Sequence, residues 1–139
     1  MSIEWRLSCS KITLAEASGA RDVCSPLERA YSGADQSRGL AGRLAAKHAV
    51  ARVLGSDPSE PGLLKQIQIV PGRRLKCHDP ALCERGHPPT VRFDPESGLA
   101  ESNGLLWIDV SVSHDREQAF AAALGVFFVQ ATRDDMRGD

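Results

Sequence analysis

The sequence has few aromatic residues and no long apolar run. Aromatic side chains make up 5% of its 139 residues, so close packing of small side chains must build much of the core. No stretch approaches the roughly 20 apolar residues of a membrane span. The first residues also lack the apolar stretch of a secretory signal peptide. We therefore expect a cytoplasmic protein that does not contact a membrane.

The chain also lacks an excess of charge of either sign. Its formal net charge is −1, which provides no broad basic surface for nucleic acid and leaves any anion site to a local cluster. The length fits one domain, which we place at 1–132 with an insertion at about 72–85 and a flexible tail at 133–139. Without a sign of secretion, we expect reduced thiols at Cys9, Cys24, Cys77 and Cys83.

Hydrophobic periodicity predicts an α+β domain with helices packed on a largely antiparallel sheet. Ile3, Trp5 and Leu7 alternate with polar residues, which is typical of a half-buried strand. Ser25-Pro26-Leu27-Glu28 has the cap, the proline and the glutamate of a helix start. A second helix is predicted at 37–54 and further strands at 64–70, 90–93, 105–113 and 119–129.

The predicted helix at 37–54 has one face of small residues and two basic flanks. The small face suits close packing on a sheet and contains Gly42, Ala45, Ala46, Ala49, Val50 and Val53. Arg43 and Lys47 form one flank, and His48 and Arg52 form the other. Like charges four residues apart repel each other, and an anionic ligand would relieve that repulsion. The alternative is a set of solvated basic side chains.

Four segments together resemble one enzyme family. They are Arg43-Leu44-Ala45-Ala46-Lys47-His48-Ala49-Val50-Ala51-Arg52-Val53-Leu54-Gly55, Val110-Ser111-Val112-Ser113-His114-Asp115, Gly86-His87-Pro88-Pro89 and Ser25-Pro26-Leu27-Glu28. In this order and spacing they resemble the small, trimeric class of 4′-phosphopantetheinyl transferases, the holo-acyl-carrier-protein synthases. The resemblance covers about residues 24–129 and implies the 4′-phosphopantetheinyl transferase-like fold.

The resemblance implies a transferase with coenzyme A as substrate, an acyl carrier protein as partner and a homotrimeric assembly. In the family, magnesium is held by a first-strand Asp and by the Glu of a Lys-Glu-Ala motif. Here His48 stands at the Glu position, and Leu7 or Ser8 stands near the Asp position. Imidazole is a poor magnesium ligand, so we expect no ordinary magnesium site, although Glu28 matches a third acidic position.

The resemblance also assigns roles to individual residues. It implies catalytic roles for Glu28, Lys47 and the replaced position His48. The implied contacts to coenzyme A come from Arg43, Lys47, Arg52, Pro88, Ser111, Ser113 and His114. A Ser-His-Asp triad within 113–115 is not expected, because neighbouring residues in a strand point to opposite faces.

The insertion contains Cys77, His78 and Cys83, and His87 lies in the Gly86-His87-Pro88-Pro89 segment that follows it. Two thiolates and two imidazoles can form a tetrahedral zinc site, but their spacing matches no known zinc-finger pattern. A disulfide between the cysteines, or incidental thiols in a loop, is the simpler explanation.

Two hypotheses of function therefore remain from the sequence. The first is an atypical or weak transferase. The second is a silent or repurposed homologue that binds a carrier protein or a coenzyme A-like ligand in polyketide or fatty-acid biosynthesis. In the repurposed form, His48 or His114 is an acid–base group for new chemistry on a carrier-bound substrate.

Overall fold

The computed structural model describes residues 2–20, 23–29, 37–71 and 89–130. The predicted insertion at about 72–85 and the predicted tail at 133–139 lie outside these residues. The extent of the domain at 1–132 therefore stays a prediction.

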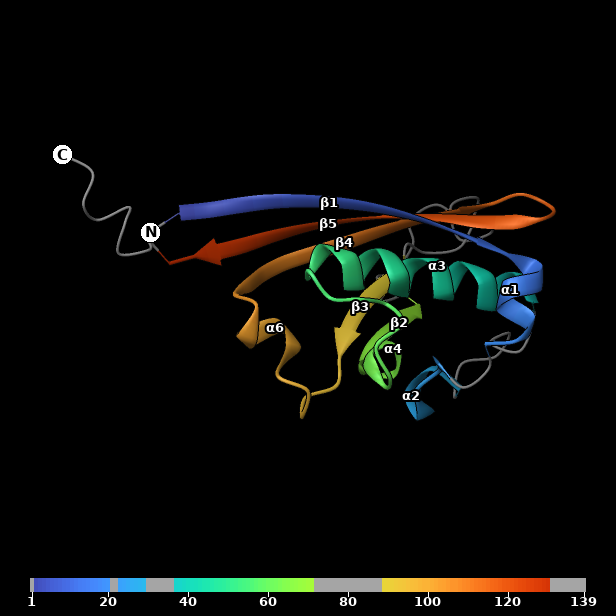
Figure 1. The fold of residues 1–139 in the computed structure, drawn as a ribbon, viewed down its shortest axis with the longest axis horizontal. Helices are drawn as coiled ribbons and strands as arrows, with labels where there is room; N and C mark the ends of the chain where they lie inside the picture. Colours follow the sequence, from blue (N-terminus) through green and yellow to red (C-terminus); the bar gives the residue numbers. More distant parts are fainter. Residues whose placement is uncertain (1, 21–22, 30–36, 72–88, 131–139) are drawn as a thin grey trace, which may run out of the picture.

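Three long strands form one antiparallel sheet in the order β1-β5-β4. They are β1 (Ser2–Thr13), β5 (Gln118–Val129) and β4 (Leu105–His114). A separate antiparallel pair joins β2 (Ile67–Pro71) to β3 (Pro89–Phe93). Helices pack against these strands (Figure 1), so the predicted α+β fold with a largely antiparallel sheet is confirmed.

The long helix α3 (Ser37–Val53) lies between the three-stranded sheet and the β2–β3 pair (Figure 1). Its predicted small face is buried: Ala45 and Ala49 are inaccessible to solvent, and Val53 is 2% exposed. The helix approaches the sheet closely at Gly125 of β5, where an added Cβ atom would lie 2.7 Å from Cγ1 of Val53. Small residues on both surfaces therefore bring α3 close to the sheet.

Four short helices complete the described part: α1 (Leu14–Ser18), α2 (Pro26–Arg29), α4 (Leu63–Gln66) and α6 (Leu99–Ser102). The predicted helix start at Ser25 is confirmed. The strand predicted at 64–70 begins only at Ile67, because α4 occupies the residues before it. Helix α1 was not predicted, although its capping box of Thr13 and Glu16 is visible in the sequence.

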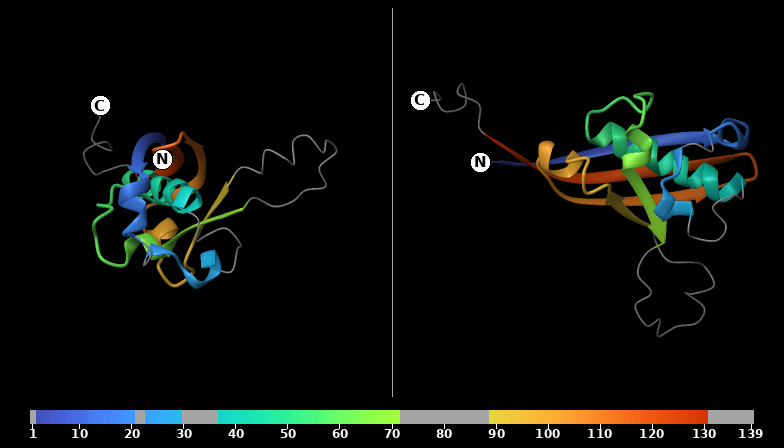
Figure 2. Two further views of the ribbon diagram at one scale, coloured as in Figure 1. Left: turned by 90° about the vertical axis from the view of Figure 1, so that its right-hand side faces the viewer. Right: turned by 90° about the horizontal axis from the view of Figure 1, so that it is seen from below.

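The sequence pattern predicts that the apolar side of the first strand is buried. For a single chain this prediction is wrong. Ile3, Trp5 and Leu7 are 57%, 66% and 69% exposed, because α3 packs against the other side of β1. In Figure 1 no described helix or strand lies on the upper face of the sheet. Figure 2 shows from two further directions that α3 covers one face only. The uncovered face also carries Trp107 and Phe120.

Candidate functional site

The ammonium group of Lys47 is completely enclosed by protein. The side chain has no solvent exposure, and burial lowers its pKa, while the carboxylate of Glu28 acts in the opposite direction. Nζ donates hydrogen bonds to Oε1 of Glu28 at 2.5 Å, to the carbonyl of Val23 at 2.7 Å and to the carbonyl of Leu64 at 2.6 Å. An ammonium group has three donors, so each already has a protein acceptor.

Glu28 connects three segments of the chain. Its Oε1 accepts a hydrogen bond from the backbone N–H of Ser25, and the Ser25 hydroxyl accepts one from the N–H of Glu28. Its Oε2 accepts a hydrogen bond from the N–H of Ile69 at 3.2 Å. The carboxylate thus caps α2, pairs with α3 and holds the middle of β2. These bonds satisfy a buried charge that would otherwise be costly.

Arg43 lies beside the same carboxylate. Its Nε is 3.4 Å from Oε2 of Glu28 and donates to the carbonyl of Ile69 at 3.2 Å. Its Nη1 is buried and has no hydrogen-bond partner among the described residues. Arg43 therefore retains a donor, whereas a phosphate could bind Lys47 only by displacing one of its three protein acceptors. We name Glu28, Arg43 and Lys47 the buried ion cluster.

The other flank of α3 faces β1. Nη1 of the exposed Arg52 donates to the carbonyl of Cys9 at 3.1 Å. Gly42 packs near Val112, whose row of the sheet contains Ser10. Val53 packs near Gly125, whose row contains Arg6.

His48 lies midway between Gly42 and Val53 along α3, and it shares the flank of Arg52 because the two are four residues apart. It is therefore about level with Ser8 of β1, two residues from Ser10. Both serines are on the side of β1 that faces α3; Ser10 is buried, while Leu7 points away. Of the two positions predicted to replace the first-strand Asp, only Ser8 faces this flank.

Burial lowers the pKa of His48, the charge of Arg52 lowers it further, and Glu16 acts in the opposite direction. The imidazole is therefore less readily protonated in the folded chain than in the unfolded chain, whose ordinary His pKa is 6.5. Protonation below that pH favours unfolding, so stability present above it is lost as the pH falls through the lower pKa of the folded state.

We predict that His48→Gln makes the stability of the protein less sensitive to acid. Between about pH 7 and about pH 5, the free energy of unfolding should fall less in the variant than in the wild type, because the variant no longer has this titration. Urea denaturation at a series of pH values measures the difference. Equal falls in the two proteins would contradict the prediction.

The predicted residues of β4 lie on both faces of the sheet. The ring of His114 packs against α3, since a Cβ atom added to Gly42 would lie 3.1 Å from its Nε2 and 3.3 Å from its Cδ2. Ser111 and Ser113 alternate with the helix-facing residues and are exposed on the opposite face. The structure therefore brings His114, but not the two serines, to α3 of the same chain.

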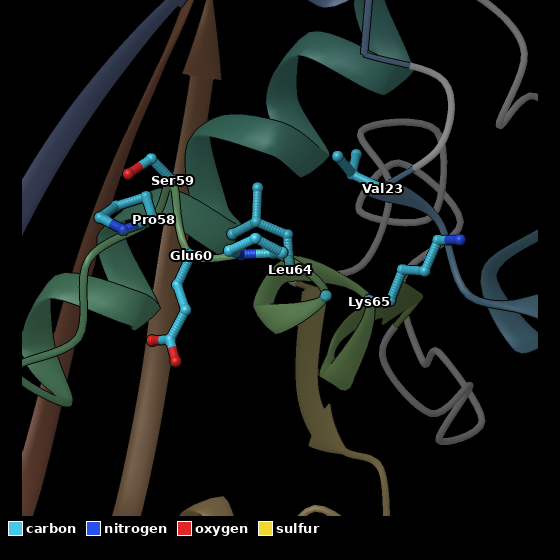
Figure 3. A pocket seen from close by; sticks show the side chains of 8 residues that line it. Val23, Pro58, Ser59, Glu60, Leu64 and Lys65 are labelled. Atoms are coloured by element: carbon cyan, nitrogen blue, oxygen red, sulfur yellow. The ribbon is translucent and has the colours of Figure 1, made fainter.

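A pocket of about 360 Å³ lies beside the buried ion cluster. It is lined by Val23, the loop 58–62, Leu64 and Lys65, and Figure 3 shows Glu60 and Lys65 on different sides of it. The carbonyls of Val23 and Leu64 accept hydrogen bonds from Lys47, so this wall of the pocket is fixed by the cluster. None of the predicted ligand-binding residues lines the pocket.

Several predicted residues lie outside the described part of the chain: Pro88 and the zinc candidates Cys77, His78, Cys83 and His87. The zinc site stays a prediction. Within 2–20, 23–29, 37–71 and 89–130, no three His, Cys, Asp or Glu side chains are grouped so that they could hold a metal ion. No helix among these residues is long and apolar enough to cross a membrane.

The arrangement of the sheet, α3 and the β2–β3 pair matches solved structures over most of the chain. The holo-acyl-carrier-protein synthase of Helicobacter pylori, in complex with coenzyme A, has a TM-score of 0.66 at 17% identity and covers 86% of this chain and 99% of its own. The Plasmodium yoelii acyl carrier protein synthase with ADP bound has a TM-score of 0.68 at 16% identity and covers 93% and 100%. The fold is that of the acyl-carrier-protein synthases.

The Mycobacterium tuberculosis acyl carrier protein synthase is 26% identical, with a TM-score of 0.61, and covers 86% of this chain and 94% of its own. No protein-family model matches the sequence, and no curated protein sequence does either. The similarity to the acyl-carrier-protein synthases therefore rests on the fold.

The side chains between α3 and β1 do not fit a magnesium ion. His48, Ser8 and Ser10 present an imidazole and two hydroxyls, whereas magnesium is usually bound through carboxylates. Glu28 is held within the buried ion cluster, and Glu16 accepts hydrogen bonds from the backbone and hydroxyl of Thr13. No step of a reaction is therefore assigned to magnesium in this chain.

Proposed function

We propose that the chain is a phosphopantetheinyl transferase-like protein that acts on an acyl carrier protein with coenzyme A as donor. The main support is the similarity of nearly the whole chain to the Helicobacter pylori synthase, which was solved with coenzyme A. Transfer is weak or follows an atypical route, because His48 stands at the family's Glu position and Leu7 or Ser8 stands near its Asp position.

In this proposal, Arg52 and His114 bind the phosphates of coenzyme A. Arg52 is exposed and donates through Nη1 to a backbone carbonyl, and a guanidinium has five N–H donors in a fork that suits phosphate. His114 is exposed at the end of β4. Arg43 contributes a hydrogen-bond donor to the same phosphates through its buried Nη1. Lys47 does not contact the ligand in this proposal and holds α3 in place through its three protein acceptors. Pro88, Ser111 and Ser113 remain proposed contacts of the ligand.

The deciding experiment is mass spectrometry of an apo carrier protein incubated with this protein, coenzyme A and magnesium. We expect a slow mass gain of one phosphopantetheine that requires coenzyme A and is reduced in Arg52→Ala. No mass gain, together with no heat of coenzyme A binding in calorimetry, would contradict the proposal.

A second candidate function is carrier-protein or coenzyme A binding without transfer. The observation that favours it is the lack of magnesium-fitting side chains between α3 and β1. Coenzyme A binding without any mass gain on the carrier protein supports this alternative. If His48 is instead an acid–base group for a reaction on a substrate attached to the carrier protein, both His48→Ala and His48→Glu should abolish that reaction.

We further propose that the chain forms a homotrimer through the uncovered face of its sheet. Five large apolar side chains are exposed on this face: Ile3, Trp5, Leu7, Trp107 and Phe120. Exposed apolar side chains gathered on one face usually mark an interface. A chain that stays alone in solution would leave these side chains in water.

Leu7→Lys should therefore separate the subunits, because it places a charge in the centre of the proposed interface. Sedimentation velocity should show a trimer for the wild type and a monomer for the variant. Glu101→Lys, which is exposed on α6, is the control and should leave the trimer intact. A monomeric wild type would refute the assembly.

A further inference from the structure

Gly42 is an unusual residue for its place in the fold. It lies inside α3 and is buried, although glycine weakens the interior of a helix relative to alanine. No positive φ is recorded for it, unlike Gly55 or Gly62, so the backbone conformation does not require glycine there. The reason must be the space that a side chain would occupy.

Two side chains of β4 fill that space. A Cβ atom on Gly42 would lie 3.1 Å from Nε2 of His114 and 3.1 Å from Cγ1 of Val112. These distances are shorter than ordinary carbon contacts. The Nε2–Cδ2 edge of the imidazole therefore rests on α3, and the Nδ1 edge is turned away from Gly42.

We propose that Gly42 is a positioning residue that seats the imidazole of His114 against α3, with the Nδ1 edge presented to a phosphate of coenzyme A. The proposal rests on the proposed function for the identity of the ligand. The seating of the ring is a property of the protein without ligand. Alanine at position 42 would lift the ring from the helix and change which edge of it a ligand meets.

Nuclear magnetic resonance of the histidine ring nitrogens in the ligand-free protein tests the seating directly. Gly42→Ala should shift the resonances of His114, while Gly39→Ala, at an exposed position of the same helix, should not. Gly42→Ala combined with Val112→Ala removes the second close contact. It should still shift the His114 resonances, and it provides a folded protein if the single variant does not fold.

Calorimetry with coenzyme A tests the consequence for binding. Gly42→Ala should weaken the affinity about tenfold, the scale of one hydrogen bond to a charged group. It should have no further effect in a His114→Ala background. Equal weakening in both backgrounds would show that Gly42 acts through Val112 and would overturn the proposal.

Unchanged His114 resonances in Gly42→Ala would also overturn it. If the wild type does not bind coenzyme A at all, the proposed function fails, while the resonances still decide whether Gly42 positions His114.

Discussion

Glu28→Gln is expected to lower the free energy of unfolding by about 3–5 kcal/mol, the typical loss when one partner of a buried ion pair is removed. Glutamine keeps one acceptor oxygen but leaves the buried ammonium of Lys47 without a counter-charge. Lys47→Met should lower the free energy of unfolding by a similar amount, because it removes the main counter-charge of the buried Glu28 carboxylate. Arg43 is then the remaining cation beside that carboxylate. Urea denaturation near neutral pH measures both losses.

The exposed ion pair between Arg6 and Glu4 is a control within the same chain. Its side chains are 37% and 51% exposed, so Glu4→Gln should change stability by at most about 1 kcal/mol. The double variant of Glu28→Gln and Lys47→Met should lose less than the sum of the single losses, because the two residues are in contact. Strictly additive losses would contradict a direct pair.

Restoring acids between α3 and β1 is expected to have the largest effect on activity. His48→Glu combined with Ser8→Asp or Ser10→Asp places two carboxylates on facing surfaces of β1 and α3. Magnesium stabilises developing charge by several kcal/mol, so we expect carrier-protein modification to rise by at least about tenfold over the wild type. The rate of mass gain of the carrier protein at saturating magnesium is the measurement.

Ser8→Asn or Ser10→Asn, each combined with His48→Glu, is the matched control for this prediction. Asparagine has the size of aspartate but no charge, so it should contribute little to magnesium binding and should leave the rate near that of His48→Glu alone. Equal rates for Asp and Asn at positions 8 and 10 would show that the restored charge has no part in the rise. Strong transfer by wild type that His48→Ala leaves unchanged would show that His48 has no part in the reaction.

Elements that depend on local interactions could be predicted from the sequence. The helix start at Ser25 follows from a capping box, whose hydrogen bonds are formed within four residues. The extent of α3 and its buried small face follow from spacing along a single helix. The order of strands and helices predicted an α+β domain for the same reason, since the period of the hydrophobic pattern reports the type of each element.

Which face of each element is covered depends on packing between distant segments and could not be predicted from the sequence. The pattern of Ile3, Trp5 and Leu7 is that of a strand with one apolar face, but α3 packs on its other side. A period of two identifies two faces and does not say what lies against either of them.

The same limit applies to the residues of the site. Lys47 looks like a basic side chain on the flank of a helix, and its burial depends on Glu28, Val23 and Leu64, which are 17 to 24 residues away in sequence. His114 meets Gly42 through a helix-to-sheet contact across more than half the chain. Such contacts form only when the whole domain packs, because each requires a surface that another segment provides.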